Sequence, residues 1–181
     1  MLTLEQKKEL LSLARNAISA HFKHQTVTLP EDPAFHFQRG VFVSLHINGN
    51  LRGCIGYIKG YKSIAESVKE MAEAAAFQDP RFPPLTEKEL EKVTIEISIL
   101  GELIPLPKNE LPVIGRDGLY IQHPYGSGLL LPQVAVEYNW QPETFLREVC
   151  RKAGLPPTAY LDPASVVYRF TADVFSEADT F

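Results

Sequence analysis

A cysteine and an arginine lie two residues apart in the glycine-containing hexapeptide Leu-Arg-Gly-Cys-Ile-Gly at residues 51–56. A guanidinium near a thiol favours the thiolate, which is the nucleophilic form of cysteine. The glycines, Gly53 and Gly56, allow another backbone or a substrate to approach this segment closely. The spacing therefore identifies Cys54 as a candidate catalytic nucleophile and Arg52 as the residue that assists it.

A structural interpretation competes with this catalytic one. Free cysteines are among the most buried residue types, and Arg52 can equally pair with a distant carboxylate. A cysteine nucleophile also needs a base within hydrogen-bond reach. The candidates are His36, His46 and His123, none of which forms a recognised local motif with Cys54. The spacing alone favours the structural interpretation.

The segment Asp79-Pro80-Arg81-Phe82-Pro83-Pro84 is a second candidate region. Its prolines restrict the backbone, so its charged side chains start from defined positions. Arg81 can hold an anionic ligand, because a guanidinium binds carboxylates and phosphates through paired donors. A structural ion pair between Asp79 and Arg81 explains the same residues equally well.

The hexapeptide falls in the second strand of a predicted hairpin. Residues 40–47 and 51–58 read as strands on either side of Asn48-Gly49, which is a strong signal for a two-residue turn. Such a turn places Arg52 and Cys54 on one face of the hairpin and His46 on the other. The side chains expected on the same face as Cys54 are those of Val43, Leu45 and Ile47.

The remaining pattern predicts α+β architecture with a mostly antiparallel sheet flanked by helices. Capping boxes beginning at Thr3, Ser63 and Thr86 each predict a helix start. Further elements are a strand over 93–99, a hairpin from 118 to 131 that turns at 125–128, a helix over 142–153 and a last strand over 166–174. Residues 1–181 are expected to form a single domain.

Composition narrows the class of protein. The chain has 181 residues, 45% of them hydrophobic and 22% charged, with a net charge of −4. Its lysines and arginines form no basic run, which argues against nucleic-acid binding. We find no apolar stretch of membrane-spanning length and no signal-peptide core, and the two cysteines make no disulfide framework. We therefore expect a cytoplasmic protein with no membrane association, metal site or cofactor.

The hexapeptide also resembles the signature of the AMMECR domain family. Further blocks that match the family in order span nearly the whole chain. These blocks are Ala74-Ala75-Ala76 with Asp79, Arg81, Phe82 and Pro84; Glu96–Leu100; Gly118-Leu119; Leu130–Ala135; Trp140; Phe145-Leu146; Lys152–Leu155; and Phe175. Polar or reactive members of these blocks extend the candidate ligand-binding residues to Asp79, Arg81 and Gln133, with His123 as a further candidate.

The resemblance implies an α+β fold with two unequal lobes and a cleft between them. It also implies the AmmeMemoRadiSam system, in which such proteins are associated with a Memo-like protein and a radical S-adenosylmethionine enzyme. No reaction is established for the family, so the resemblance implies no catalytic residue. We therefore expect an accessory component that binds a ligand or a partner. The alternative is a thiol-dependent enzyme that uses Cys54.

Overall fold

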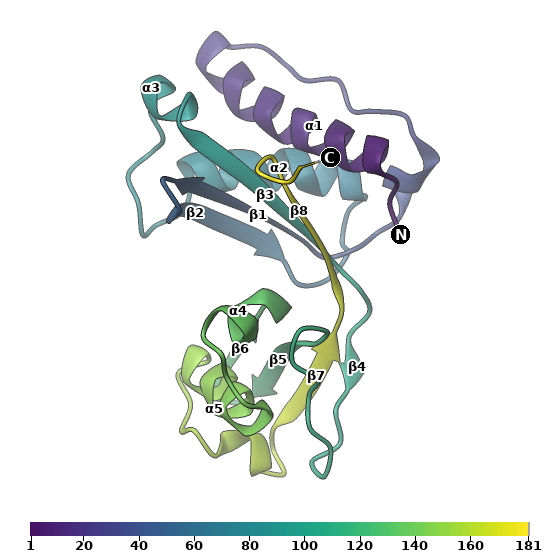
Figure 1. Cartoon of the computed structure of the whole chain (residues 1–181), viewed down its shortest axis with the longest axis vertical. Helices are drawn as coiled ribbons and strands as arrows, with labels where there is room; N and C mark the ends of the chain where they lie inside the picture. The colour runs from purple at the N-terminus through teal and green to yellow at the C-terminus, as the bar shows by residue number, and fades with distance from the viewer. Residues whose placement is uncertain (181) are drawn as a thin grey trace. The chain divides into compact units, whose positions relative to one another are not determined.

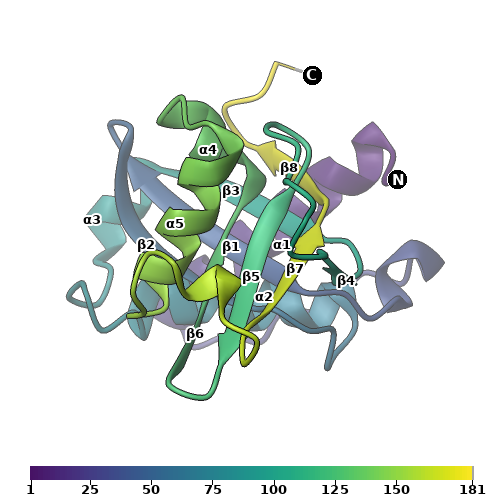
Figure 2. The same cartoon turned by 90° about the horizontal axis from the view of Figure 1, so that it is seen from below.

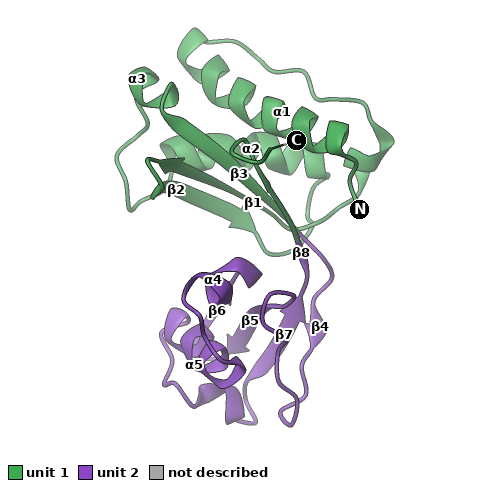
Figure 3. Ribbon diagram, viewed as in Figure 1, with its two compact units in different colours: residues 1–99, 173–181 green, residues 100–172 purple. Residues whose placement is uncertain are grey.

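The computed structural model describes residues 1–180, which divide into two compact units of unequal size (Figure 3). Unit 1 comprises Met1–Ile99 together with the segment from Asp173 onward, and unit 2 comprises Leu100–Ala172. Each unit contains a four-stranded sheet with helices packed on it. The α+β prediction and the two unequal lobes are thus confirmed, while the cleft stays a prediction.

Unit 1 places two long helices on one face of its sheet (Figure 1). The strand order is β2-β1-β3-β8, with β1 antiparallel to both β2 and β3. Strand β2 is therefore an edge strand. The elements are α1 (Leu4–Lys23), η1 (Pro33–His36), β1 (Val41–Ile47), β2 (Asn50–Tyr57), α2 (Ile64–Phe77), α3 (Glu87–Leu90), β3 (Val93–Leu100) and β8 (Ala172–Ser176).

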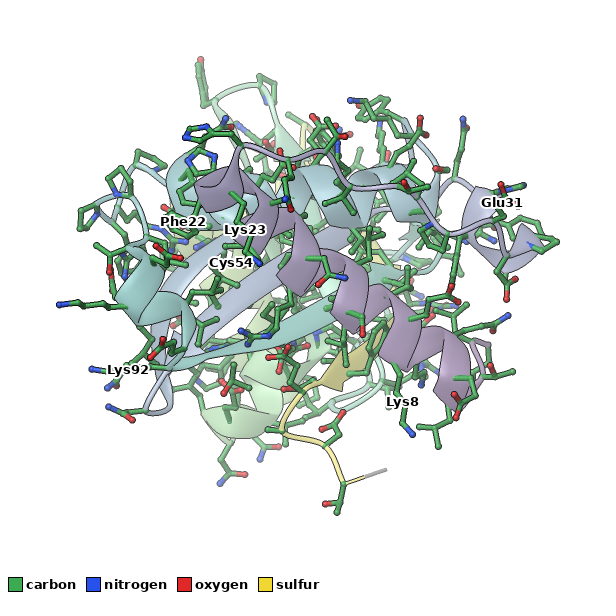
Figure 4. The ribbon with its side chains drawn as sticks, turned by 90° about the horizontal axis from the view of Figure 1, so that it is seen from above. Lys8, Phe22, Lys23, Glu31, Cys54 and Lys92 are labelled. Carbon is green, nitrogen blue, oxygen red and sulfur yellow. The ribbon has the colours of Figure 1, made fainter. Side chains whose placement is uncertain are left out.

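Local signals account for where these helices begin. Thr3, Ser63 and Thr86 are the N-caps of α1, α2 and α3, and each forms the predicted reciprocal capping box. In α1 the buried residues recur with helical spacing and face α2 and the sheet. Figure 4 shows Lys8 near the start of this helix and Phe22 and Lys23 at its end.

Unit 2 is built around the strand order β4-β7-β5-β6. Helix α5 packs against β5 and β6, and the view in Figure 2 shows it alongside these strands. Its core includes Leu119, Ile121, Phe145 and Val149. The elements are β4 (Ile104–Pro105), β5 (Gly118–His123), β6 (Gly126–Leu130), α4 (Pro132–Glu137), α5 (Pro142–Lys152), η2 (Ala159–Leu161) and β7 (Val166–Phe170).

Two predicted elements are corrected by the structure. The hairpin of unit 2 turns at Pro124-Tyr125, and Gly126–Gly128 belong to β6 instead of the turn. The last strand, predicted over 166–174, is interrupted at Thr171. Strand β7 pairs in the sheet of unit 2 and β8 in the sheet of unit 1, because continuous alternation in a sequence carries no information about which sheet each half joins.

Candidate functional site

The first hairpin has the predicted turn but not the predicted register. Asn48 and Gly49 both have positive φ, +52° and +78°, as a type I′ turn requires. The first two pairs, Ile47 with Asn50 and His46 with Leu51, follow from that turn. Beyond them a β-bulge inserts Arg52 as an extra residue, so Leu45 pairs with Gly53.

The bulge reverses the faces of the residues that follow it. Cys54 pairs with Ser44 and not with Val43, so the predicted placement of Cys54 beside Val43, Leu45 and Ile47 is wrong. The Ser44 hydroxyl donates a hydrogen bond to Cys54 Sγ at 3.1 Å. His46, two residues along β1 from Ser44, lies on the Cys54 face, contrary to the predicted register.

The glycine before the cysteine explains why the bulge is needed. A Cβ at Gly53 would lie 2.1 Å from the carbonyl oxygen of Ala75 in α2, a distance that no side chain tolerates. Gly53 must therefore face α2, and the next residue, Cys54, faces the opposite side of the sheet. Gly56 makes room in the same way for the ring of Phe42, whose Cγ would lie 2.3 Å from an added Cβ.

Arg52 is held by the helix that follows the proline-rich loop. Its Nε donates to Glu89 Oε2 at 2.7 Å, and its Nη2 donates to Glu89 Oε1 at 3.2 Å and to the carbonyl oxygen of Pro83 at 2.8 Å. The Arg52 side chain is only 11% exposed. Glu89 also completes the capping box of α3 with Thr86, so one carboxylate fixes both the helix start and Arg52.

Asp79 and Arg81 form a clamp on the outer edge of β2. Asp79 Oδ2 accepts a hydrogen bond from the backbone N–H of Cys54 at 3.0 Å. The Arg81 guanidinium donates through Nη2 to the Cys54 carbonyl oxygen at 3.3 Å. The two side chains thus satisfy both backbone groups of Cys54 that an additional strand would otherwise bind. We call this arrangement the edge clamp.

The clamp is also an ion pair with a buried carboxylate. Asp79 Oδ1 accepts from the backbone N–H and Nε of Arg81, both at 3.0 Å, and Oδ2 accepts from Nη2 at 2.8 Å. The Asp79 side chain is 1% exposed and that of Arg81 is 51% exposed. The hydrogen bonds from Arg81 are the main reason why the pKa of Asp79 lies well below its ordinary value. The structural pair weighed from the sequence is therefore present.

Electrostatics around the thiol oppose its ionisation. Burial is the largest influence on Cys54 and raises the pKa of its thiol above the ordinary value. The Ser44 hydrogen bond and the charge of Arg81 act in the opposite direction without reversing the shift. The cation that acts on Cys54 is Arg81, whereas the sequence suggested Arg52. Arg52 instead lowers the pKa of Glu89 to about 2.

The candidate residues divide between the two units. Arg52, Cys54, Asp79 and Arg81 lie together in unit 1, joined by the edge clamp and the β2 bulge. His123 and Gln133 lie in unit 2. Gln133 is the second residue of α4 and is half-buried, and His123 ends β5.

Both ring nitrogens of His123 have partners, which bears on its suggested role as a base. Nε2 lies 3.1 Å from Asp162 Oδ2, and Nδ1 accepts the backbone N–H of Tyr125 at 3.1 Å. The side chain is 8% exposed. In this arrangement the imidazole holds the hairpin turn and has no nitrogen left to take a proton from a substrate.

Sequence reasoning missed Ser44 and Glu89. In the sequence Glu89 is recognisable only as part of a capping box, a role that accounts for a glutamate at this position without any need for Arg52. Ser44 was not considered as a partner of Cys54, because the bulge that pairs the two residues leaves no mark in the hydrophobic pattern. Within residues 1–180, no group of three or more His, Cys, Asp or Glu side chains is arranged to hold a metal ion.

The chain has the fold of an α+β protein, with two antiparallel sheets flanked by helices. Its first hairpin is held at the outer edge by the edge clamp. A sequence profile of the AMMECR1 family matches residues 11–175. The chain therefore belongs to the AMMECR1 family, as its resemblance predicted. None of the helices within residues 1–180 has the length and apolar character needed to cross a membrane.

Similar proteins come from archaea. A protein of Methanothermobacter thermautotrophicus is 42% identical over 186 residues, covering 97% of this chain and 96% of that protein. Protein MJ0810 of Methanocaldococcus jannaschii is 41% identical over 188 residues, covering 99% and 94% respectively. The crystal structure of the uncharacterised protein PH0010 from Pyrococcus horikoshii matches with a TM-score of 0.86 at 38% identity, covering 93% of this chain and 90% of that one.

Proposed function

We propose that residues 1–181 act as one AMMECR domain whose signature hairpin is a binding surface and not a catalytic centre. In this proposal the protein is an accessory component that works with a Memo-like protein and a radical S-adenosylmethionine enzyme, the partners that the family resemblance implies. Two free cysteines suit a reducing, cytoplasmic setting. The net charge of −4 supports protein or small-molecule partners over nucleic acid.

The edge clamp is the observation that carries the proposal. Its two charged side chains form hydrogen bonds with the backbone of Cys54 and with each other. Arg52 likewise forms an ion pair with Glu89. The hydrogen bonds of Asp79 and Arg81 to Cys54 and the bond from Arg52 to the Pro83 carbonyl oxygen hold the segment from Asp79 to Pro84 against β2.

This segment presents residue types that dominate protein interfaces. The Arg81 guanidinium lies 5.5 Å from the centre of the Phe82 ring, and half of its side chain is exposed. Arginine and aromatic residues are enriched among the few side chains that supply most of the binding energy at an interface. Pre-organisation lowers the entropy cost of binding. The Arg81–Phe82 surface is therefore our candidate partner-binding surface.

The experiment compares two matched arginine variants in binding to the purified Memo-like protein and to the purified radical enzyme. Arg116 is a close counterpart of Arg81: it is 52% exposed and paired with the fully buried Asp117. Arg81→Ala and Arg116→Ala thus remove equivalent pairs in different units. We expect Arg81→Ala to weaken partner binding by about 30-fold in biolayer interferometry, corresponding to about 2 kcal/mol.

The expected result for Arg116→Ala is an unchanged dissociation constant. Circular dichroism spectra of both variants show whether the fold is retained. Equal losses in the two variants, or no binding of the parent chain to either partner, would overturn the accessory proposal.

The alternative is a thiol-dependent enzyme in which Cys54 is the nucleophile, with Arg81 in the assisting role that the sequence suggested for Arg52. It is favoured by the half-buried position of the Cys54 residue and by the hydrogen bond that Sγ accepts from Ser44. Alkylation by iodoacetamide, mapped by mass spectrometry, distinguishes Cys54 from the buried Cys150. We expect Cys54 to react more slowly than an exposed cysteine at neutral pH, because burial raises the pKa of its thiol. A reactive thiolate below about pH 8 would favour the enzyme instead.

A further inference from the structure

A depression on unit 2 lies between the β5–β6 turn and the segment that leads into β7. Its volume is about 620 Å³, within the range of small-molecule sites. The side chains that decide its chemistry are Tyr120, Gln122, His123, Tyr125, Ser127 and Val166.

The floor belongs to the sheet face opposite α5. Leu119 and Ile121 point into the core beneath α5, so the alternating residues Tyr120 and Gln122 face away from it. Gln122 Nε2 donates to the Tyr120 hydroxyl at 3.1 Å. Tyr120 is also stacked on Tyr168 of the neighbouring strand, with ring centres 6.0 Å apart. The floor is thus an aromatic surface with an amide fixed on it.

The two walls are tied to each other through His123. Its Nε2 lies 3.1 Å from Oδ2 of Asp162, which stands behind the wall that contains Ala164, and its Nδ1 accepts the N–H of Tyr125 on the other wall. Asp162 in turn accepts the N–H of Ala164, which lines the depression.

Close packing also fixes the hairpin that carries Tyr125. An added Cβ at Gly126 would lie 2.3 Å from the carbonyl oxygen of Ala153, and one at Gly128 would lie 2.7 Å from the Ala153 nitrogen. The hairpin therefore rests directly on the end of α5. Tyr125 lies in the turn just before Gly126, with 89% of its surface exposed. Its ring centre lies 5.4 Å from that of His123.

The lining has no Lys, Arg, Asp or Glu side chain. It combines flat aromatic surfaces with a primary amide, and the Gln122 amide retains an N–H donor and a carbonyl acceptor besides its bond to Tyr120. Stacking on tyrosine suits any base, and glutamine pairs its amide with the adjacent donor and acceptor of adenine. The lining offers no lysine or arginine side chain to bind a phosphate group.

We propose that this depression binds a neutral heteroaromatic ring of purine size, stacked on Tyr125 and hydrogen-bonded by Gln122. The site lies entirely in unit 2 and is independent of the partner-binding surface proposed for unit 1. Its ligand is therefore a small molecule that offers an aromatic face and a donor–acceptor edge and needs no charged group for recognition.

Adenosine is the probe, and isothermal titration with the full chain is the measurement. We expect saturable binding, with AMP binding no more tightly than adenosine. Tyr125→Ala should weaken adenosine binding about tenfold or more, and Gln122→Ala by a similar factor. Tyr125 is so exposed that its removal leaves the fold intact.

Tyr61→Ala is the matched control, because Tyr61 is a 67% exposed tyrosine in unit 1. It should leave the dissociation constant unchanged. Equal weakening by Tyr61→Ala and Tyr125→Ala, no adenosine binding at millimolar concentration, or binding of a neutral disaccharide in its place would each overturn the proposal.

Discussion

Asp79→Asn tests the edge clamp directly. The substitution keeps the size of the side chain but removes its charge and replaces one carboxylate oxygen by an NH2 group. In the parent chain both oxygens accept only, from Cys54 N–H and from three donors of Arg81. The asparagine oxygen can accept from either the Cys54 N–H or the Arg81 donors. Its NH2 group must then face the other donors, which lose their acceptor.

The magnitude follows from burial. Arg81 is 51% exposed, so solvent screening limits the ion pair itself to about 0–1 kcal/mol. Asp79 is 1% exposed, so a donor left facing the new NH2 group loses its partner without access to water, at about 1–3 kcal/mol. Together these give a free energy of unfolding about 1–4 kcal/mol lower than that of the parent chain.

The pH dependence supplies a second test with a definite sign. The pKa of Asp79 is lowered in the folded state, so its stabilisation is fully present above its ordinary value of about 3.9. The stabilisation is lost as pH falls through the lower folded value. The difference between parent and Asp79→Asn should therefore be constant above about pH 5 and smaller at pH 3.

Urea unfolding followed by far-UV circular dichroism, at pH 7 and pH 3, measures both effects. Glu31→Gln is the control, because Glu31 is an exposed loop residue of the same unit, labelled in Figure 4, and its variant should stay within about 0.5 kcal/mol of the parent. A deficit below about 0.5 kcal/mol for Asp79→Asn, or one that is equal at both pH values, would refute the clamp.

Three further substitutions test the hairpin and its second ion pair. Gly53→Ala forces a methyl group against the Ala75 carbonyl oxygen and should lower the urea midpoint by an amount worth about 2–3 kcal/mol. Gly49→Ala, in open space at φ +78°, should cost only about 1–2 kcal/mol, and the reverse order would contradict the packing argument. Glu89→Gln retains the capping box and should cost about 1 kcal/mol at pH 7 through loss of the Arg52 pair. Because the folded pKa of Glu89 is about 2, that difference should fade as pH drops from about 4.3 towards 2, and a pH-independent difference in thermal unfolding would exclude the pair.

The elements that the sequence predicted well are those specified by neighbours a few residues apart. The capping boxes at Thr3, Ser63 and Thr86 use partners three residues away, and all three helices start there. Asn48-Gly49 encodes its own turn because both residues accept positive φ. Helix α4 was missed because its N-cap, Leu131, makes no side-chain cap and only a proline marks its first turn.

The sequence by itself determined the family, the α+β class, the helix starts and the first turn, since each depends on local chemistry or on ordered motifs. Only the tertiary structure decided which way Cys54 faces, which carboxylate holds Arg52 and which sheet each half of the last strand joins. The close approach of Gly53 to Ala75 demands one extra residue in β2, and one residue reverses every face that follows. Contacts between residues far apart in the chain leave no periodic trace, so packing alone sets them.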